Sequence, residues 1–304
     1  MAVKDLDSLV ELIVERMGSQ AEEAGTSRAE VDISGGIDSA TVAALSVRAF
    51  GEDKVIGVYT SVNSTDSSRR LARLVAEAFR FPLVELELSA IYEQVVSSVA
   101  AEFERLDLPF PDPGDLAHRT VFGGLRSCLR APVGRFVNRA FGGGIRQGTG
   151  NRDEDELLRF YQKGGDGEVD CNWIAGLFKS EVWELASHLG VPEEVIRAEP
   201  TPDLWGTGSA HTDEDELEEL TGVPLTYTRP GGPTGTIEWV SRENARNGCI
   251  TGTAAQTPPA DLGYGAQQAR VIMAVRRMER ITRHKAEPPP HLSRSALIAA
   301  GVVD

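Results

Sequence analysis

The chain has 304 residues, of which 41% are hydrophobic and 25% are charged, and its formal net charge at pH 7 is -15. This length can bury a large core and favours a single domain over residues 1–304, and no apolar run reaches the roughly 18 residues that a membrane span needs. The negative charge would repel a phosphate backbone, so no nucleic-acid partner is expected.

Helices and strands alternate along the first ninety residues. The apolar positions of residues 6–18 fall on one helical face, and this start lacks the basic-then-apolar order of a signal peptide, so we expect a cytoplasmic protein. Short apolar strands then alternate with helices, the strands at 29–34, 54–61 and 83–89 and the helices at 39–50 and 67–80. This order predicts an α/β fold of three layers, a mostly parallel sheet with helices on both faces.

The remainder of the chain is less regular. Residues 91–140 are predicted to be mostly helical, residues 145–147 form a weak strand, and the apolar stripe of 179–191 predicts a further helix. The Pro/Gly/Thr-rich segment 223–263 is interpreted as a loop-rich insertion or lid, and residues 264–285 as a C-terminal helix.

The cysteines argue against a disulfide framework. Only Cys128, Cys171 and Cys249 are present, and they are widely spaced and odd in number. No CxxC pair suggests a metal site, so each cysteine is interpreted as a small buried hydrophobic residue.

The hexapeptide SGGIDS, residues 34–39, lies where a predicted strand passes into a helix. Ser34, Gly35 and Gly36 permit a tight turn with inward amide hydrogens, and the helix N-terminus adds positive potential, which together suit a polyanion. Asp38 can reach a metal ion. No lysine follows the glycines as in a GxxxxGK[ST] loop. The motif therefore predicts a pyrophosphate site, and the alternative is a plain Gly-Gly turn capped by serine.

This hexapeptide resembles the pyrophosphate loop of the N-type ATP pyrophosphatases, which cleave ATP between its α and β phosphates. Further segments resemble, in the same order, the signatures of the ammonia-dependent NAD synthetase family: GTGNRDEDE at 148–156, GGDGEVD at 164–170, LFKSEVWELASHLGVPEEVI at 177–196, EPTPDLW at 199–205, TDEDEL at 212–217 and RHK at 283–285. The resemblance implies an adenine nucleotide alpha hydrolase-like (Rossmann-like) fold, with ATP as co-substrate and Mg²⁺ as cofactor.

The resemblance also implies roles at the ATP end of the site. Asp38 and Glu154 would hold Mg²⁺, a hard cation that suits carboxylates; Asp155 remains an alternative to Glu154 because one extra residue lies between this acidic loop and GGDG. The implied ATP contacts are Ser34, Gly35, Gly36, Asp38, Ser39, Thr149, Lys179 and Thr201. By themselves, GNRDEDE equally suits a solvated acidic turn and Lys179 a surface lysine.

The implied reaction has two steps. A carboxylate of deamido-NAD attacks the α-phosphorus of ATP and releases pyrophosphate, and ammonia then displaces AMP from the acyl-adenylate to give NAD. Ammonium dominates at neutral pH and is not nucleophilic, so a base must take its proton. The matching position is Asp166, which is as readily a turn residue, and Asp38 is the other residue expected to act in catalysis. The implied contacts with the acid substrate are Arg130, Lys163, Asp170, His284 and Lys285.

No glutaminase part is recognisable, so we expect free ammonia or ammonia from a separate donor protein, and the family's arrangement implies a homodimer. The chain departs from the family mainly on the acid-substrate side. Its run GGLRSCLR, residues 123–130, stands where the family has GN-x-x-AR-x-R, so that Gly124 and Cys128 replace an asparagine and an arginine. Gly164 replaces a tyrosine. A thiol cannot replace the bidentate anion recognition of a guanidinium.

Several functional alternatives therefore stay open. The first is the same adenylation and amidation chemistry on a different carboxylic acid in a specialised biosynthetic pathway. The second is a catalytically silent nucleotide-binding protein. The third, a tRNA-modifying relative, needs a basic surface or an RNA-binding appendage, which the acidic composition does not suggest.

Overall fold

A parallel sheet of four strands carries the fold. The computed structural model describes residues 3–115, 118–201, 211–247, 257–287 and 291–303, and within them the strands are β1 (Ala29–Asp32), β2 (Val55–Ser61), β3 (Leu83–Glu87) and β4 (Ile145–Gln147). Their order across the sheet is β3-β2-β1-β4. In the register, Ala29 pairs with both Val55 and Ile145, and Gly57 pairs with Leu83. All neighbours are parallel, so every strand ends at the same edge of the sheet.

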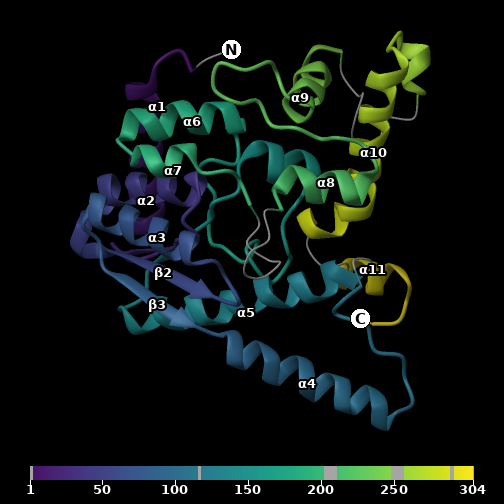
Figure 1. The fold of residues 1–304 in the computed structure, drawn as a ribbon, viewed down its shortest axis with the longest axis horizontal. Coiled ribbons are helices and arrows are strands. Elements are labelled where there is room, and N and C mark those ends of the chain that lie inside the picture. Colours follow the sequence, from purple (N-terminus) through teal and green to yellow (C-terminus); the bar gives the residue numbers. More distant parts are fainter. Residues whose placement is uncertain (1–2, 116–117, 202–210, 248–256, 288–290, 304) are drawn as a thin grey trace.

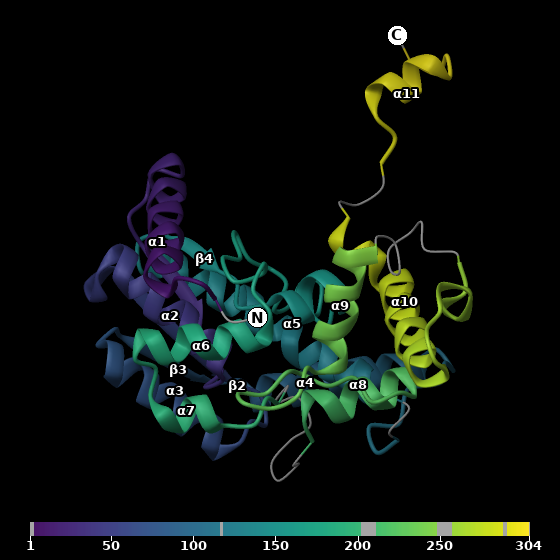
Figure 2. The same cartoon turned by 90° about the horizontal axis from the view of Figure 1, so that it is seen from above.

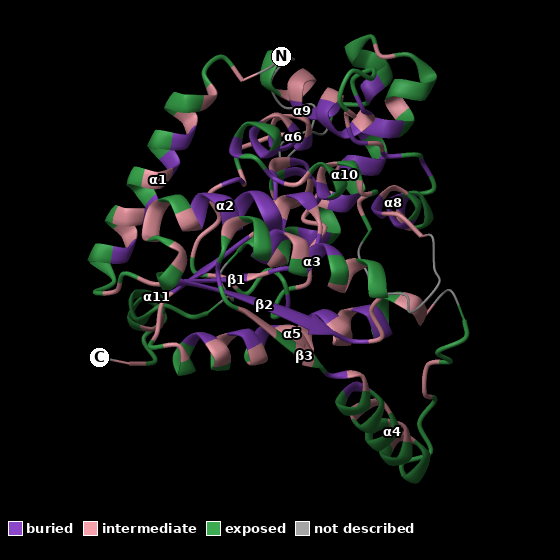
Figure 3. Ribbon diagram, turned by 60° about the vertical axis from the view of Figure 1, so that its left-hand side comes forward, coloured by how far each residue is buried: buried purple, intermediate pink, exposed green. Residues whose placement is uncertain are grey.

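Helices cover both faces of this sheet (Figure 1, Figure 3). One face carries α2 (Ile37–Phe50) and α3 (Asp66–Phe79), and the other carries α5 (Arg119–Ala140). An outer layer of α1 (Leu6–Glu23) and α6 (Lys179–Leu189) packs on α2. The predicted three-layer α/β fold with a parallel sheet is confirmed.

Burial explains why these segments adopt these conformations. Every residue of β2 is buried, as expected for a parallel strand covered on both faces. The alanine-rich α2 is buried along most of its length, because it lies between the sheet and the outer helices. In α3, Thr65 caps the first turn by accepting a hydrogen bond from the Ser68 amide (3.2 Å). A short 3-10 turn, η1 (Glu52–Lys54), leads into β2.

Within the described residues, β3 and β4 are connected by two helices. They are α4 (Ser89–Arg105) and α5, as the prediction of a mostly helical segment at 91–140 requires. α4 projects away from the body of the molecule (Figure 1), and Tyr92 is its buried residue. α5 lies along the sheet and continues through Pro132.

The last half of the chain supplies the remaining helices. They are the π-helical turn η3 (Asp153–Leu158), α7 (Glu193–Arg197), α8 (Asp213–Thr221), α9 (Thr236–Asn247), the 3-10 turn η4 (Pro259–Leu262), α10 (Ala266–Ala286) and α11 (Arg294–Ala299). The predicted C-terminal helix is confirmed as α10. Figure 2 shows α9 beside α10, and α11 standing apart from the body. None of the helices within the described ranges is long and apolar enough to cross a membrane.

Segment 223–263 is more structured than its composition suggests. Leu225, Tyr227, Ile237 and Val240 are buried in the main hydrophobic core, the last two from α9. Tertiary packing of these few apolar residues stabilises a helix that their periodicity alone does not predict. Residues 248–256 of the segment lie outside the described residues. Its role as a lid stays a prediction, as does the assignment of the whole chain to one domain.

Candidate active site

A large cavity opens at the carboxyl edge of the sheet. Its volume is about 1230 Å³, and its wall includes the turn after β1, the loop after β4 and one side of α5. The residues predicted to bind ATP all line it: Ser34, Gly35, Gly36, Asp38, Ser39, Thr149, Lys179 and Thr201. Glu154 and Asp166 also line it. The fold thus brings the predicted nucleotide, metal and base positions into one space.

The turn from β1 into α2 is held by its own serine hydroxyls. The Gly36 amide donates to Ser34 Oγ (3.2 Å), and the Ser39 hydroxyl donates to the Gly36 carbonyl oxygen (2.9 Å). Gly35 has a φ of +89°, and a Cβ there would lie 2.5 Å from the Ser68 carbonyl oxygen. Glycine is therefore required at position 35 by both conformation and space. The tight turn aims the first amides of α2 at the cavity, an arrangement suited to an anionic ligand.

Lys179 joins the two carboxylates predicted to hold a metal ion. Its Nζ donates to Asp38 Oδ2 (2.5 Å) and to Glu154 Oε1 (2.9 Å), and its side chain is only 2% exposed. Burial lowers the pKa of the ammonium, but the charges of Asp38 and Glu154 outweigh this effect and raise the pKa above its usual value. Burial raises the pKa of Glu154, and the Lys179 charge opposes that rise. Lys179 thus stays protonated and serves as the counter-charge of the pair.

Neighbouring side chains fix this arrangement. Asn151 Nδ2 donates to Asp38 Oδ1 (3.0 Å), while Asn151 Oδ1 accepts from the amides of Asp153 (3.0 Å) and Glu154 (3.2 Å). The Tyr227 hydroxyl donates to Glu154 Oε1 (3.3 Å), and the centre of its ring lies 5.2 Å from Lys179 Nζ. Because Tyr227 belongs to segment 223–263, that segment forms part of the site.

The two candidates for the second metal-binding carboxylate differ in their partners. Glu154 shares Lys179 with Asp38, whereas Asp155 Oδ2 accepts a hydrogen bond from Asn172 Nδ2 (2.6 Å). The geometry therefore favours Glu154. Two carboxylates that converge on one cation fit Mg²⁺, which commonly takes one or two protein carboxylates together with substrate phosphates. Within the described residues no cluster of three or more His, Cys, Asp or Glu side chains that could hold a metal ion occurs.

Further buried acids surround this pair. Burial raises the pKa of Asp153 and of Asp155 to about 7, and it raises the pKa of Asp213 to about 8. The nearby Glu154 charge adds to the rise at Asp155 and Asp213. These acids are therefore partly protonated near neutral pH, which lowers the negative charge that an anionic ligand meets.

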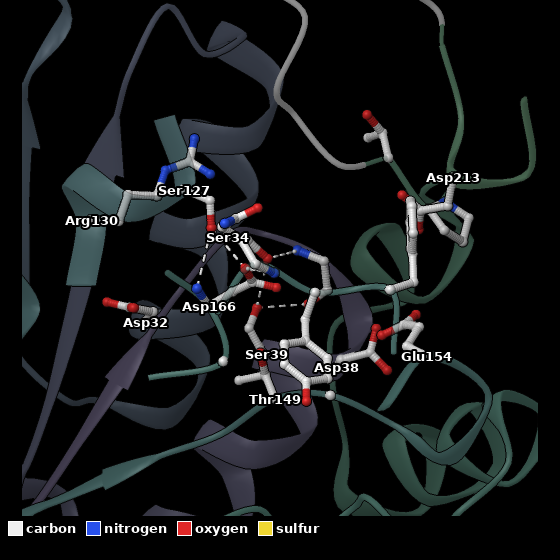
Figure 4. Close-up of a pocket in the computed structure, with 18 of the residues that line it drawn as sticks. Asp32, Ser34, Asp38, Ser39, Ser127, Arg130, Thr149, Glu154, Asp166 and Asp213 are labelled. Carbon is white, nitrogen blue, oxygen red and sulfur yellow. Dashed lines mark hydrogen bonds between the residues drawn. The ribbon is translucent and has the colours of Figure 1, made fainter. Parts of the chain in front are cut away.

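The opposite side of the cavity is formed from α5 and the turn 162–168. Figure 4 shows Arg130, Ser127 and Asp166 across the cavity from Glu154 and Asp213. The Ser127 hydroxyl donates to Asp166 Oδ1 (2.7 Å). Arg130 Nε donates to the Thr60 carbonyl oxygen (3.2 Å) at the end of β2.

A buried ionic network lies beneath this side. Arg146 on β4 bonds Glu30 through Nη1 (3.0 Å) and Asp32 through Nη2, and both Arg146 and Glu30 are inaccessible to solvent. Burial and the Asp32 charge raise the pKa of Glu30 to about 8, against the effect of Arg146. Asp32 is the member of the network that lines the cavity.

Only some of the residues predicted to bind the acid substrate line the cavity. Arg130, Lys163 and Lys285 line the cavity, and Asp170 and His284 do not. Asp170 instead accepts hydrogen bonds from Arg135 Nη1 (2.7 Å) and from the Arg146 amide (2.8 Å). His284 is exposed near the end of α10, where its Nδ1 lies 3.1 Å from the Ile281 carbonyl oxygen. Substrate binding by these two residues stays a prediction.

The sequence analysis missed several polar residues of the cavity region. Asn151 lies within the quoted GTGN run, so its position was available as a signal. Ser127 and Asp213 lie in the runs GGLRSCLR (123–130) and TDEDEL (212–217), so their positions were likewise available as signals. Tyr227 lies in no such run, and only the folded chain brings segment 223–263 beside Glu154. Thr212 caps α8 in the manner of a surface helix, which hides the burial of Asp213.

The sheet and its site define a Rossmann-like α/β protein with a cavity at the carboxyl edge of a parallel sheet, where ligands bind in this class. The family model described as NAD synthase matches residues 9–222. The chain belongs to the NAD synthase family.

Individual proteins agree with this assignment. The NH(3)-dependent NAD(+) synthetase of Methanococcoides burtonii is 36% identical over 214 residues, which cover 70% of this chain and 75% of that protein. The corresponding protein of Methanosarcina acetivorans is 30% identical over 294 residues, which cover 94% of this chain and 98% of that protein.

Two solved structures illustrate the shared fold. The NMN synthetase of Francisella tularensis has a TM-score of 0.70 at 19% identity, covering 95% of this chain and 99% of its own. The NH3-dependent NAD synthetase of Campylobacter jejuni has a TM-score of 0.64 at 18% identity, covering 95% and 100%.

Proposed function

We propose that this protein is an ATP-dependent amide ligase that converts deamido-NAD to NAD. The carboxylate of deamido-NAD attacks the α-phosphorus of ATP, the bond to the β-phosphate oxygen breaks, and pyrophosphate leaves. Ammonia then attacks the acyl carbon of the adenylate and displaces AMP. The relatives described as NH(3)-dependent NAD(+) synthetases support this substrate over the alternative of another carboxylic acid.

The first step uses the end of the cavity around β1. The amides of the turn 34–36 bind the pyrophosphate oxygens, aided by the N-terminus of α2. Lys179 reaches the same space and supplies a positive charge to the phosphates, with Thr149 and Thr201 in the wall beside it. Asp38 and Glu154 would hold Mg²⁺, which when bound supplies charge neutralisation for the leaving pyrophosphate.

The second step needs ammonia rather than ammonium. Asp166 is exposed on the cavity wall and would accept the proton from ammonium before the nitrogen attacks. Arg130, Lys163 and Lys285 line the cavity and would offer positive charge to the anionic acid substrate.

One observation carries the proposal: Asp38 and Glu154, which are 116 residues apart in the chain, meet on the buried Lys179 in the cavity beside the SGG turn. The test is to incubate the purified protein with ATP, Mg²⁺ and ammonium, with and without deamido-NAD, and to follow AMP, pyrophosphate and NAD by mass spectrometry. NAD formation that depends on deamido-NAD and is lost in Asp38→Ala supports the proposal. AMP formation with another acid from a carboxylate panel, and none with deamido-NAD, would point to the alternative substrate.

We further propose that the enzyme is a homodimer. α4 carries Ile91, Val95 and Val99 at helical spacing; Ile91 is 53% and Val99 42% exposed, and Val95 is half-buried between them. A second copy of the chain is the occupant that suits such an apolar stripe on an otherwise acidic protein. Sedimentation velocity should give a dimer for the wild type and a monomer for Val99→Asp; a wild-type monomer at micromolar concentration would refute this part.

The ammonia source and location complete the proposal. We expect free ammonia, or ammonia from a separate donor protein, and an enzyme that works in the cytoplasm. Cys128 and Cys171 are free thiols, as suits a reducing compartment.

A further inference from the structure

The Asp166 carboxylate is held on one side only. Its Oδ1 accepts hydrogen bonds from the Ser127 hydroxyl (2.7 Å) and from the Gln162 amide (2.9 Å). No hydrogen bond to Oδ2 occurs among the residues that the structure describes, and Asp166 is exposed on the cavity wall. One oxygen is thus anchored, and the other is presented to the cavity.

Ser127 is bonded to Asp166 in both directions. Besides donating to the carboxylate, its Oγ accepts a hydrogen bond from the Asp166 amide (3.2 Å). Ser127 itself is 5% exposed on α5, which packs against the sheet. The hydroxyl therefore ties both the backbone and the side chain of Asp166 to a rigid helix.

The close approach of Gly165 to α5 allows this contact. The turn that carries Asp166 passes so close to α5 that a Cβ on Gly165 would lie 2.2 Å from Ser127 Oγ. The Gly165 and Gly167 amides both donate to the Gln162 carbonyl oxygen (2.9 and 3.2 Å), which tightens the turn. No side chain larger than hydrogen fits at position 165 while the Ser127–Asp166 pair stays in place.

We propose that Ser127 is a positioning residue for the ammonia step: it aims Asp166 Oδ2 at the ammonium ion. This inference rests on the proposed function and deepens it. A base works only within hydrogen-bond reach of the proton it takes, and an orienting partner keeps it there. Loss of the Ser127 hydroxyl leaves the Gln162 amide as the remaining donor to Oδ1, so the carboxylate is held less firmly, while the nucleotide end of the cavity stays intact.

The test separates the two half-reactions. Exchange of labelled pyrophosphate into ATP, measured with deamido-NAD and Mg²⁺ but without ammonia, reports adenylation alone. Ser127→Ala should keep this exchange and lose about 10-fold in kcat/KM for ammonium. With hydroxylamine as the nucleophile, which is largely unprotonated near neutral pH and needs no base, the same variant should retain wild-type turnover. Ser127→Cys, which keeps the volume but offers only a weak donor, should show the same selectivity.

Two control experiments test whether the rate loss in Ser127→Ala reflects only a disturbed structure. Ser46→Ala removes another buried hydroxyl, one that donates to the Val42 carbonyl oxygen (2.8 Å) and lies outside the cavity wall, and it should change neither rate. In an Asp166→Asn background, Ser127→Ala should add no further loss, because Ser127 acts through Asp166.

The outcomes separate the role of Ser127 from the proposed function. Equal losses with ammonia and hydroxylamine, unchanged ammonia kinetics in Ser127→Ala, or additive losses in the double variant would each overturn the role of Ser127 while leaving the proposed function standing. Absence of both exchange and amide product in the wild type would instead remove the proposed function, and the role of Ser127 with it.

Discussion

Replacing Lys179 by methionine tests whether its ammonium is the counter-charge of the carboxylate pair. Methionine has a similar length and volume but no donor. The two ion pairs are 2.5 and 2.9 Å long, and the lysine side chain is 2% exposed. Removing one partner of a buried pair costs about 3–5 kcal/mol. At roughly 2 °C per kcal/mol for a protein of this size, Tm should fall by about 6–10 °C.

The pH dependence of this effect has a definite sign. The pKa of Lys179 is raised on folding, so its contribution is fully present below the usual pKa of 10.5 and is lost only at higher pH. The full deficit of the variant should therefore appear at pH 7. The pKa of Glu154 is raised by burial, so as the pH falls Glu154 takes up a proton, the unpaired charge decreases and the deficit should shrink.

Thermal unfolding followed by circular dichroism measures the deficit. The control is Lys54→Met on an exposed 3-10 turn, which should change stability by less than about 0.5 kcal/mol. Mg²⁺ without nucleotide should raise the Tm of Lys179→Met more than that of the wild type, because the ion can then enter between Asp38 and Glu154. A deficit below about 1 kcal/mol, or the same Mg²⁺ shift in both proteins, would refute the reasoning.

Two other predictions concern the turn and the buried acids. Gly35→Ala should destabilise by about 1–3 kcal/mol in urea unfolding, because of its positive φ and the approach to the Ser68 carbonyl oxygen; Gly51→Ala, with a φ of +86° but open space, isolates the first cause and should lose less. An equal loss in both would exclude the close approach as a cause. Asp213 has its pKa raised on folding to about 8 from 3.8, so the wild type loses stability as pH rises through this window. Asp213→Asn should match the wild type near pH 4 and exceed its stability at pH 8, and a constant difference between the two pH values would contradict the assigned pKa.

Local pattern was sufficient for much of the fold. Short apolar stretches at 29–34 and 54–61 predict β1 and β2, because parallel strands covered on both faces are rich in apolar residues, and α10 was also predicted as a helix. α9 was not predicted from local pattern. Its buried face is formed mainly by Ile237 and Val240, and its stability comes from the core that they join.

The site divides in the same way. SGGIDS by itself determined a tight turn between strand and helix, since Gly35 adopts a positive φ and the turn is local. The resemblance of separate segments predicted Asp38, Glu154, Lys179 and Asp166 as site residues, and all four line the cavity. Only the tertiary structure decided that Lys179 lies between Asp38 and Glu154, and that Ser127 anchors Asp166. Such contacts join residues far apart in the chain, and their distances and burial arise when helices pack on the sheet, so no local pattern contains them.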